Sequence, residues 1–473
     1  MISDICALSA VEMARLLRTK QLSAREVLAA HLDQIDRVNP AVNAIVTLVP
    51  EQAIAAAARA DEALARGTPI GLLHGLPIAH KDLQPTPGIR TTFGSPLFKD
   101  FVPAQGSLLV ERIARAGAIV VGKTNTPEFG AGSQTFNPVF GATRNPYDLT
   151  KTCGGSTGGG AVALACGMLP IADGTDMGGS LRNPASFCNV VGLRPSPGRV
   201  PVWPSTIGWS TLSVEGPMAR SVADAALLLS AMAGPDPRSP IAFAESGARF
   251  AAPLERDFTG VRVAWWRDLG GLPVDRRVSA RVNAQRRLFE SLGCIVEEAE
   301  PDFGDADEIF KTLRALAFVA SHGDTVARHR EMVKETIQWE VDRGRRLTLP
   351  DVARAETKRT ALYHQLRQFM ERYEFFVLPV SQVPPFDVLQ PYVTEIEGVA
   401  METYIDWMKS CYYISVTGHP AISVPAGFTS DQLPVGLQIV GRHQDDWGVL
   451  QLAHAYEQTV ASTRTWPTLG GNP

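Results

Sequence analysis

Two glycine-rich segments, each carrying one serine, constrain this chain more than any other feature of its sequence. They are Gly154–Gly160, which spells GGSTGGG, and Gly174–Ser180, which spells GTDMGGS. Dense glycine lets backbone approach backbone and lets N–H groups point into a site that no side chain obstructs. The pair predicts a site built from backbone donors around Ser156 and Ser180, and two ordinary turns are the simpler alternative.

The net charge of the chain limits the partners that we expect. Its 473 residues carry a formal net charge of −4, and 45% of them are hydrophobic. This composition is typical of a globular protein. The chain lacks the excess of positive charge that binding to nucleic acid or to an anionic membrane surface would require. No apolar run approaches the roughly 18–20 residues that cross a bilayer, and the N-terminus lacks a signal-peptide pattern. We expect a cytoplasmic monomer or homodimer that binds neither nucleic acid nor membrane.

The spacing of the cysteines argues against metal and disulfide sites, whereas the small number of lysines points to individual lysines with a specific task. The six cysteines include no Cys-x-x-Cys pair, and their spacing fits neither a zinc site nor a dense disulfide framework. We therefore expect free, buried thiols and no metal. Arginine greatly outnumbers lysine, so each lysine is a candidate for a specific task, including Lys81, Lys123 and Lys151.

Strand-like and helix-like segments alternate along the chain, which is typical of α/β layers. We expect strands at 43–49, 76–80, 118–121, 261–265, 375–379, 421–424 and 435–440. We expect helices at 51–66, 107–116, 221–233, 278–292 and 447–460, mostly helix over 305–370, and a surface loop at 195–216. The whole chain 1–473 should form one large domain, with a helical segment at 1–67, a catalytic core at 68–235, a helical insertion at 300–370 and C-terminal strands and a helix at 371–465.

Residues Gly117–Thr124 match the P-loop pattern G-x-x-x-x-G-K-[ST], but their context argues against a nucleotide site. In a P-loop the intervening residues form a phosphate-binding loop between a strand and a helix. Here they are Ala118–Val121, which are themselves predicted to be a strand, and Pro127 opposes a helix start soon afterwards. We expect no nucleoside triphosphatase.

Residues Gly154–Gly158 match the nucleophile-elbow pattern G-x-S-x-G of α/β-hydrolases, with Ser156 as the nucleophile. Such an esterase needs an acid and a histidine further along the chain, and His419 and His443 are available. This interpretation stays open, although it leaves the second glycine-rich serine segment unexplained.

The two glycine-rich segments, together with the following Leu181–Ala185, resemble the amidase signature family. The pattern of that family runs GGSSGG and then G-T-D-x-GGS-x-R-x-P-A, and Thr157 stands here in place of its second serine. The resemblance continues, in order, at 75–82, 122–128, 191–196, 418–425 and 434–438, and so covers nearly the whole chain. It implies an α/β domain with a mixed, twisted central β-sheet that helices cover on both faces.

By this resemblance Ser180 is the nucleophile, Ser156 a bridging serine and Lys81 the base, and the Gly155–Ser156 peptide is cis. The chemistry agrees, because serine is a poor nucleophile until a base removes its proton. A lysine becomes such a base when burial lowers its pKa toward neutrality, whereas an arginine does not. Ser156 can both donate and accept, so it could pass the proton of Ser180 to Lys81 and later return one to the leaving amine.

The resemblance also assigns backbone groups. The oxyanion hole would consist of the N–H groups of Met177, Gly178, Gly179 and Ser180. Gly130 and Gly132, with Ser156, would line the acyl side of the substrate pocket. Asp176 and Arg182 are interpreted as charges that hold the glycine turn and take no part in the chemistry.

The sequence thus predicts an amidase that cleaves a C–N acyl bond through an acyl-enzyme, without a metal or cofactor. The expected substrate is a small hydrophobic or aryl amide, or a carbamate, which would make the protein a urethanase. Aromatic residues in segments that could wall the pocket are Trp203, Trp209, Tyr412 and Tyr413. The alternative within the family is the amidase subunit of a tRNA-dependent glutamyl/aspartyl amidotransferase, which works with partner subunits.

Overall fold

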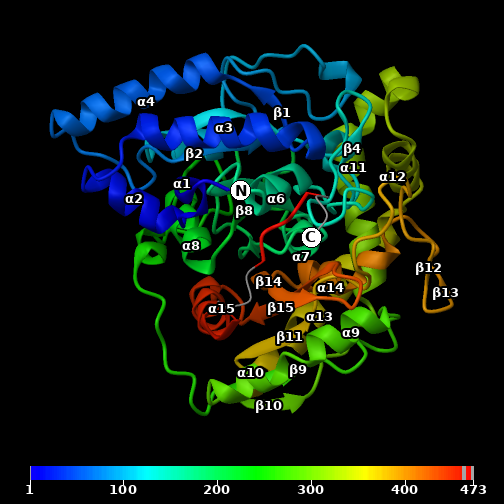
Figure 1. The fold of residues 1–473 in the computed structure, drawn as a ribbon. Coiled ribbons are helices and arrows are strands. Elements are labelled where there is room, and N and C mark those ends of the chain that lie inside the picture. Colours follow the sequence, from blue (N-terminus) through cyan, green and yellow to red (C-terminus); the bar gives the residue numbers. More distant parts are fainter. Residues whose placement is uncertain (1, 461–464, 470–473) are drawn as a thin grey trace.

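The computed structural model describes residues 2–460 and 465–469 (Figure 1). The expected domain 1–473 also includes residues 1, 461–464 and 470–473, and its segment 371–465 includes 461–464; these residues lie outside the described ones. The fold is α/β, with a large mixed sheet flanked by helices, as the sequence predicts. No helix in the described ranges is long and apolar enough to cross a bilayer.

Four helices open the chain (Figure 1, blue). They are α1 (Asp4–Ala7), α2 (Ala10–Arg18), α3 (Ala24–Val42) and α4 (Pro50–Ala65). Helix α3 begins with a capping box, in which Ser23 Oγ accepts the Glu26 N–H at 3.1 Å and the Glu26 carboxylate accepts the Ser23 N–H at 2.8 Å. These bonds satisfy N–H groups that the start of a helix leaves without intrahelical partners.

A three-stranded sheet follows. Its order is β1 (Ile45–Leu48), β3 (Ile119–Thr124) and β2 (Pro77–Lys81), and α5 (Leu108–Arg115) precedes β3. Strand β3 continues through Lys123, whose buried ammonium donates to the Gln84 carbonyl and to the Thr86 and Thr91 hydroxyls. The P-loop match is therefore an extended strand with a structural lysine, which confirms that no phosphate-binding loop forms here.

The large sheet has eight strands in the order β10-β9-β11-β15-β14-β7-β8-β6. Their bounds are β6 (Ile171–Asp176), β7 (Val191–Arg194), β8 (Val214–Ala219), β9 (Arg262–Trp265), β10 (Ile295–Glu298), β11 (Phe375–Pro379), β14 (Ala421–Phe428) and β15 (Pro434–Gly441). Strand β9 pairs in parallel with β10 and β11, whereas the other pairs are antiparallel. The sheet is mixed, and the strands expected from short β-branched runs are confirmed.

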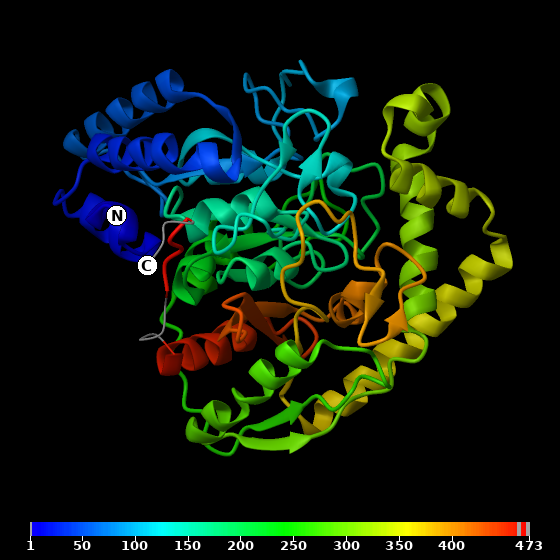
Figure 2. The same cartoon turned by 45° about the vertical axis from the view of Figure 1, so that its right-hand side comes forward.

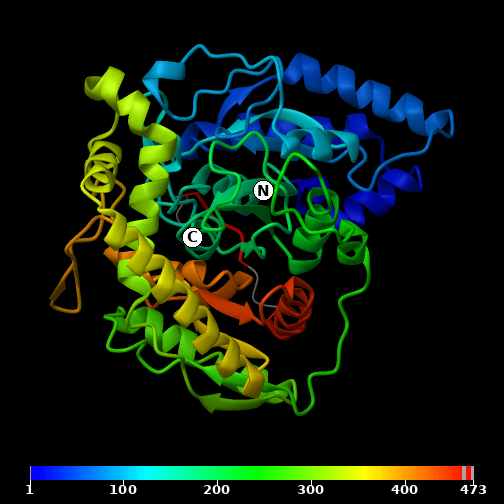
Figure 3. The same ribbon diagram turned by 180° about the vertical axis from the view of Figure 1, so that it is seen from behind.

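The remaining helices surround this sheet. They are α6 (Gly158–Ala165), α7 (Arg182–Phe187), α8 (Val222–Met232), α9 (Arg276–Asn283), α10 (Arg286–Ser291), α11 (Ala306–His329), α12 (Glu335–Arg345), α13 (Leu349–Arg372), α14 (Lys409–Thr417) and α15 (Asp446–Val460). Two short hairpins are β4 (Phe136–Asn137) with β5 (Gly141–Ala142) and β12 (Glu395–Ile396) with β13 (Val399–Ala400), and 3-10 turns lie at 96–98, 128–130, 247–251, 330–332 and 406–408. Helices α11 to α13 make up most of the segment 305–370, which the sequence predicts to be mostly helical, and they stand along one side of the molecule (Figure 2, right; Figure 3, left).

Two expected elements differ from the structure. The helix predicted at 278–292 is divided into α9 and α10 at Ala284 and Gln285. The predicted surface loop 195–216 is only partly at the surface, because its first residues are buried. There the Asp446 carboxylate accepts hydrogen bonds from the Ser196 N–H at 2.7 Å and from the Arg199 Nε–H at 3.0 Å. The last residues of the segment begin β8. Proline, tryptophan and serine predict irregular backbone in this segment but do not show whether it is buried.

Candidate active site

The two glycine-rich segments meet between the two sheets. Lys81 ends β2, Ser156 precedes α6, and Ser180 follows β6. Strands β2 and β6 lie side by side, with the Lys81 N–H donating to Asp173 Oδ2 at 3.3 Å, and the Thr157 N–H donates to the Ser180 carbonyl at 3.2 Å. The structure thus brings together the three residues that the sequence singles out, from different sheets and loops.

The Lys81 ammonium is fully buried and surrounded by hydroxyl groups. Its Nζ donates to Ser156 Oγ at 2.7 Å, to Thr175 Oγ1 at 2.8 Å and to Thr157 Oγ1 at 3.0 Å. Burial lowers the pKa of Lys81 to about 7, although the carboxyl groups of Asp173, Asp176 and Glu215 act to raise it. A lysine with such a pKa exists partly as the free amine near neutral pH, so it can accept a proton.

Both serines line one cavity of about 180 Å³. Ser156 is 1% exposed and Ser180 is 9% exposed, so Ser180 is the more open of the two. The Gly155–Ser156 peptide is cis, as the resemblance implies. Gly130 and Gly132 line the same cavity, and a Cβ on Gly130 would lie 2.8 Å from Leu83 Cδ1. A larger residue at Gly130 would therefore crowd the cavity wall.

The loop Met177–Ser180 carries the candidate oxyanion donors. Gly179 has φ +120°, and a Cβ there would lie 2.8 Å from Cys411 Sγ, so only glycine fits this turn without displacing its neighbours. The Gly179 N–H already donates to Asp176 Oδ1 at 2.9 Å. Among the described residues, the N–H groups of Met177, Gly178 and Ser180 have no backbone or side-chain acceptor. Three of the four predicted donors thus have no acceptor within the described protein.

Asp176 holds this loop through a buried network of charges. Its carboxylate accepts hydrogen bonds from Arg182 Nη2 at 2.9 Å and Nε at 3.0 Å, from Arg194 Nη1 at 3.2 Å and from the Leu181 N–H at 3.2 Å. Burial alone would raise the pKa of Asp176, but the guanidinium groups of Arg182 and Arg194 hold it well below its usual range. The interpretation of Asp176 and Arg182 as charges that hold the turn agrees with these contacts.

Asp176→Asn is expected to lower the free energy of unfolding by about 3–5 kcal/mol, because it leaves two buried guanidinium groups without a balancing charge. Urea unfolding followed by circular dichroism measures the change. The matched control is Asp324→Asn, which removes an exposed partner of Arg328 and should change stability by no more than about 0.5 kcal/mol. Equal losses in the two variants would contradict the structural role of Asp176.

Comparison with known proteins places the chain in a family. A family model described as Amidase matches residues 26–450. The chain belongs to the amidase signature family. An acylamidase from Rhodococcus erythropolis is 36% identical, over 97% of this chain and 96% of that protein. The crystal structure of a bacterial aryl acylamidase of the amidase signature family superposes with a TM-score of 0.92 at 29% identity, over all of both chains. A glutamyl-tRNA(Gln) amidotransferase subunit from Alkaliphilus metalliredigens is 33% identical over 95% of both chains.

The protein is therefore an amidase, a hydrolase that acts on carbon–nitrogen bonds other than peptide bonds. Its Ser156 matches the nucleophile-elbow pattern, but neither histidine expected as an elbow partner lines the cavity. His322 is the one histidine among the described residues that line it. His419 instead contacts Thr417 and the rings of Tyr363 and His443.

Sequence motifs did not indicate several walls of the amidase cavity. Arg314, Phe318 and His322 reach it from α11, and Met408 reaches it from the turn before α14. Arg314 Nε donates to Glu340 Oε1 at 2.8 Å. These residues lie in α11 or in the turn before α14 and belong to no short motif, so only the folded chain shows that they line the cavity.

The four aromatic residues expected as candidate pocket walls do not line this cavity. Trp209 is 78% exposed, and Trp203 stacks under the Arg238 guanidinium. Tyr412 stacks on Phe310, with 4.2 Å between the ring centroids, and lies behind the glycine loop because Phe310 borders Gly178. Composition shows that aromatic residues are present but not which side of an element they occupy.

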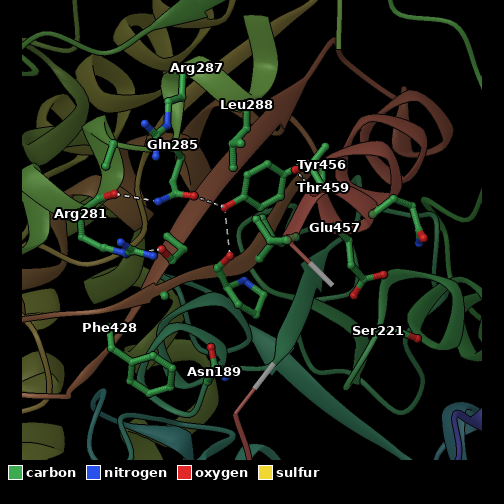
Figure 4. A pocket seen from close by; sticks show the side chains of 17 residues that line it. Asn189, Ser221, Arg281, Gln285, Arg287, Leu288, Phe428, Tyr456, Glu457 and Thr459 are labelled. Carbon is green, nitrogen blue, oxygen red and sulfur yellow. Dashed lines mark hydrogen bonds between the residues drawn. The ribbon is translucent and has the colours of Figure 1, made fainter. Parts of the chain in front are cut away.

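A separate pocket of about 400 Å³ lies between α9, α10, β14 and α15 (Figure 4). Its polar groups contact one another, since Gln285 Nε2 donates to the Arg281 carbonyl at 3.2 Å and the Tyr456 hydroxyl lies 3.1 Å from Gln285 Oε1. Of the described residues that line it, none is a lysine and none also lines the Ser180 cavity. The candidate catalytic residues of the amidase therefore lie at the smaller cavity, which Ser156 and Ser180 line.

The pKa of Lys81 predicts how the activity of the amidase depends on pH. Only the neutral amine accepts a proton, and burial brings the pKa of Lys81 to about 7. We expect kcat/KM to rise about tenfold per pH unit below 7 and to level off above 8. A profile measured between pH 5 and 9 on an uncharged amide checks this. Activity that is highest below pH 6 would contradict a lysine base.

Proposed function

We propose that this amidase acts through a covalent acyl-enzyme on Ser180, with Ser156 as the proton relay and Lys81 as the base. The observation that carries the proposal is the 2.7 Å hydrogen bond between Lys81 Nζ and Ser156 Oγ, beside a cavity that Ser156 and Ser180 both line. Within the described part of the chain, the hydrogen-bond partners of Lys81 Nζ are hydroxyl groups and include no carboxylate, so no ion pair holds its proton in place. Its environment thus favours transfer of a proton along hydroxyl groups.

The reaction begins when Ser180 Oγ attacks the carbonyl carbon of the substrate. The Ser180 proton passes to Ser156 Oγ, and the Ser156 proton passes to Lys81 Nζ. The carbonyl oxygen becomes an oxyanion that accepts hydrogen bonds from backbone N–H groups of the Met177–Ser180 loop. The C–N bond then breaks, and the proton returns from Lys81 through Ser156 to the leaving nitrogen. Water attacks the Ser180 ester by the same relay and releases the acid.

The substrate class that we propose is a hydrophobic or aryl amide, with carbamates as further substrates. Apolar side chains support this class, because Phe129, Phe318 and Met408 line the cavity of Ser180. Arg314 is the one arginine or lysine among the described lining residues, and Glu340 and Tyr404 already bind its guanidinium. The names of two similar proteins, an acylamidase and an aryl acylamidase, agree with this class.

The function is tested with a panel of p-nitroanilides, primary amides and aryl carbamates and the purified protein. We expect turnover of the anilides, with release of the amine and the acid in equal amounts. Failure to hydrolyse any member of the panel, by protein that is folded, would contradict the proposal.

A second function is supported by the likeness to a glutamyl-tRNA(Gln) amidotransferase subunit. In that role the protein would release ammonia from glutamine for a partner subunit. Ammonia release from glutamine, measured for this chain alone and with added partner subunits, separates the two functions. Stimulation by partners together with inactivity toward anilides would favour the amidotransferase role.

A further inference from the structure

Arg314 brings a buried guanidinium group to the cavity that Ser156 and Ser180 share. The side chain comes from α11, lines this cavity and is 6% exposed. Its Nη1 lies 3.3 Å from Met177 Sδ, and Met177 also lines the cavity. Met177 begins the loop of candidate oxyanion donors that ends at Ser180. One end of the guanidinium group therefore lies beside that loop.

The guanidinium group of Arg314 has more donors than its protein partners use. An arginine side chain carries five N–H groups. Nε donates to Glu340 Oε1 at 2.8 Å, and Nη2 donates to the Tyr404 hydroxyl at 2.7 Å. The partner of Nη1 among the described residues is the thioether of Met177, which is a weak acceptor. Nη1 thus lacks a strong acceptor within the described protein. A donor in this position costs free energy that an oxygen atom of a ligand would recover.

The charge of Arg314 is balanced by Glu340, which is fully buried. Glu340 Oε1 accepts hydrogen bonds from Arg314 Nε at 2.8 Å and from the Tyr404 hydroxyl at 3.0 Å. A carboxylate of a ligand beside the guanidinium group would lie close to the carboxylate of Glu340, and like charges repel. The pair therefore favours a neutral oxygen acceptor over an anionic one.

The same contacts fix the orientation of the guanidinium group. Arg314 Cζ lies 4.3 Å from the centroid of the Phe318 ring, and planar guanidinium groups stack on aromatic rings. With this ring on one side and Glu340 and Tyr404 as hydrogen-bond partners, the side chain is held before a ligand binds. A donor held in this way loses little conformational entropy on binding.

We propose that Arg314 is a specificity-determining residue of the amidase, which donates a hydrogen bond from Nη1 to a neutral oxygen acceptor of the substrate other than the scissile carbonyl. The substrate class then narrows to hydrophobic or aryl amides that carry a second, uncharged acceptor such as a carbonyl group. The proposal rests on the proposed acyl transfer at Ser180, because it concerns the same cavity.

Isosteric substrates test this preference in both halves of an amide. The pairs are N-(3-acetylphenyl)acetamide with N-(3-isopropylphenyl)acetamide, N-(4-acetylphenyl)acetamide with N-(4-isopropylphenyl)acetamide, and acetoacetanilide with 3-methylbutananilide. In each pair the first compound has a carbonyl oxygen where its partner has a methyl group. The preference is the kcat/KM of the carbonyl compound divided by that of its partner. Dividing the wild-type preference by that of a variant removes the intrinsic reactivity of the two amides.

Two variants remove the Nη1 donor. Arg314→Lys keeps a cation for Glu340 but lacks the planar fork of the guanidinium group. Arg314→Met combined with Glu340→Gln removes both charges, so no buried carboxylate is left unpaired. For the pair with the largest wild-type preference, we expect each variant to reduce that preference about tenfold, because a hydrogen bond from a charged donor is lost.

The matched control is Arg328→Lys, the same substitution on an exposed residue of α11, which should leave the preference unchanged. Thermal unfolding establishes which variants are folded, and either folded variant decides the test.

The outcomes separate this inference from the proposed function. An unchanged preference in a folded variant, with normal hydrolysis of the methyl partners, overturns the role of Arg314 and leaves acyl transfer intact. Faster wild-type hydrolysis of 4-acetamidobenzoate than of N-(4-acetylphenyl)acetamide would reveal an anion site and overturn the neutral acceptor. If wild type hydrolyses none of these amides, the proposed function itself is wrong.

Discussion

Ser180→Ala is expected to lower kcat by about 10⁴-fold or more and to abolish formation of the acyl-enzyme. Ser156→Ala should leave slow residual turnover, because water can replace a relay but not a nucleophile. The structure supports this difference, since Ser180 is the more open serine and Ser156 Oγ is held by the Lys81 ammonium at 2.7 Å. Steady-state hydrolysis of a p-nitroanilide measures both effects.

The control for these serine variants is the pair of histidines that a nucleophile elbow would use. His419→Ala and His443→Ala should retain activity, because neither side chain lines the cavity that Ser156 and Ser180 share. Thermal unfolding confirms that each variant is folded. Full activity in Ser180→Ala together with loss in either histidine variant would establish Ser156 as the nucleophile of an esterase-like mechanism.

Lys81→Arg is expected to be nearly as damaging as Lys81→Ala, with kcat/KM lowered by about 10³-fold or more in each. The required property is a free amine near neutral pH, and the guanidinium group keeps its proton throughout that range. The planar guanidinium is also larger than the ammonium, which is fully buried against three hydroxyl groups. Measurement of kcat/KM at pH 8.5 compares the two variants directly.

The matched control is Lys99→Arg, the same substitution on an exposed residue, which should not change activity. Retention of wild-type activity in Lys81→Arg would show that a positive charge suffices and would refute the base assignment. Loss in Lys81→Ala with retention in Lys81→Arg would instead make Lys81 an electrostatic residue.

Much of the fold follows from local sequence. The short β-branched run Ala118–Val121 gives a strand, and the serine and glutamate at the start of α3 form a capping box, a pattern that depends only on residues close in the sequence. The division of 278–292 into α9 and α10 was not predictable, because its apolar spacing is compatible with one helix. The burial of the first part of 195–216 depends on Asp446, which is far away in the sequence.

The candidate site also has parts that sequence motifs indicate and parts that only the folded structure shows. Lys81, Ser156, Ser180, Gly130 and Gly132 lie in short motifs, and the structure places all five around one region. The α11 wall of the cavity lies outside those motifs, and its position depends on how distant segments pack. The oxyanion loop shows an intermediate case. Its glycines are evident in the sequence, but the engagement of the Gly179 N–H by Asp176 appears only in the folded chain.

The most direct test of the mechanism is to identify which serine becomes acylated. The protein is incubated with a slowly released aryl carbamate, quenched in acid and digested, and the modified peptide is sequenced by mass spectrometry. We predict that the carbamoyl group is found on Ser180, in wild type and in Ser156→Ala at a lower rate, and is absent from Ser180→Ala. A carbamoyl group on Ser156 that persists in Ser180→Ala would contradict the account.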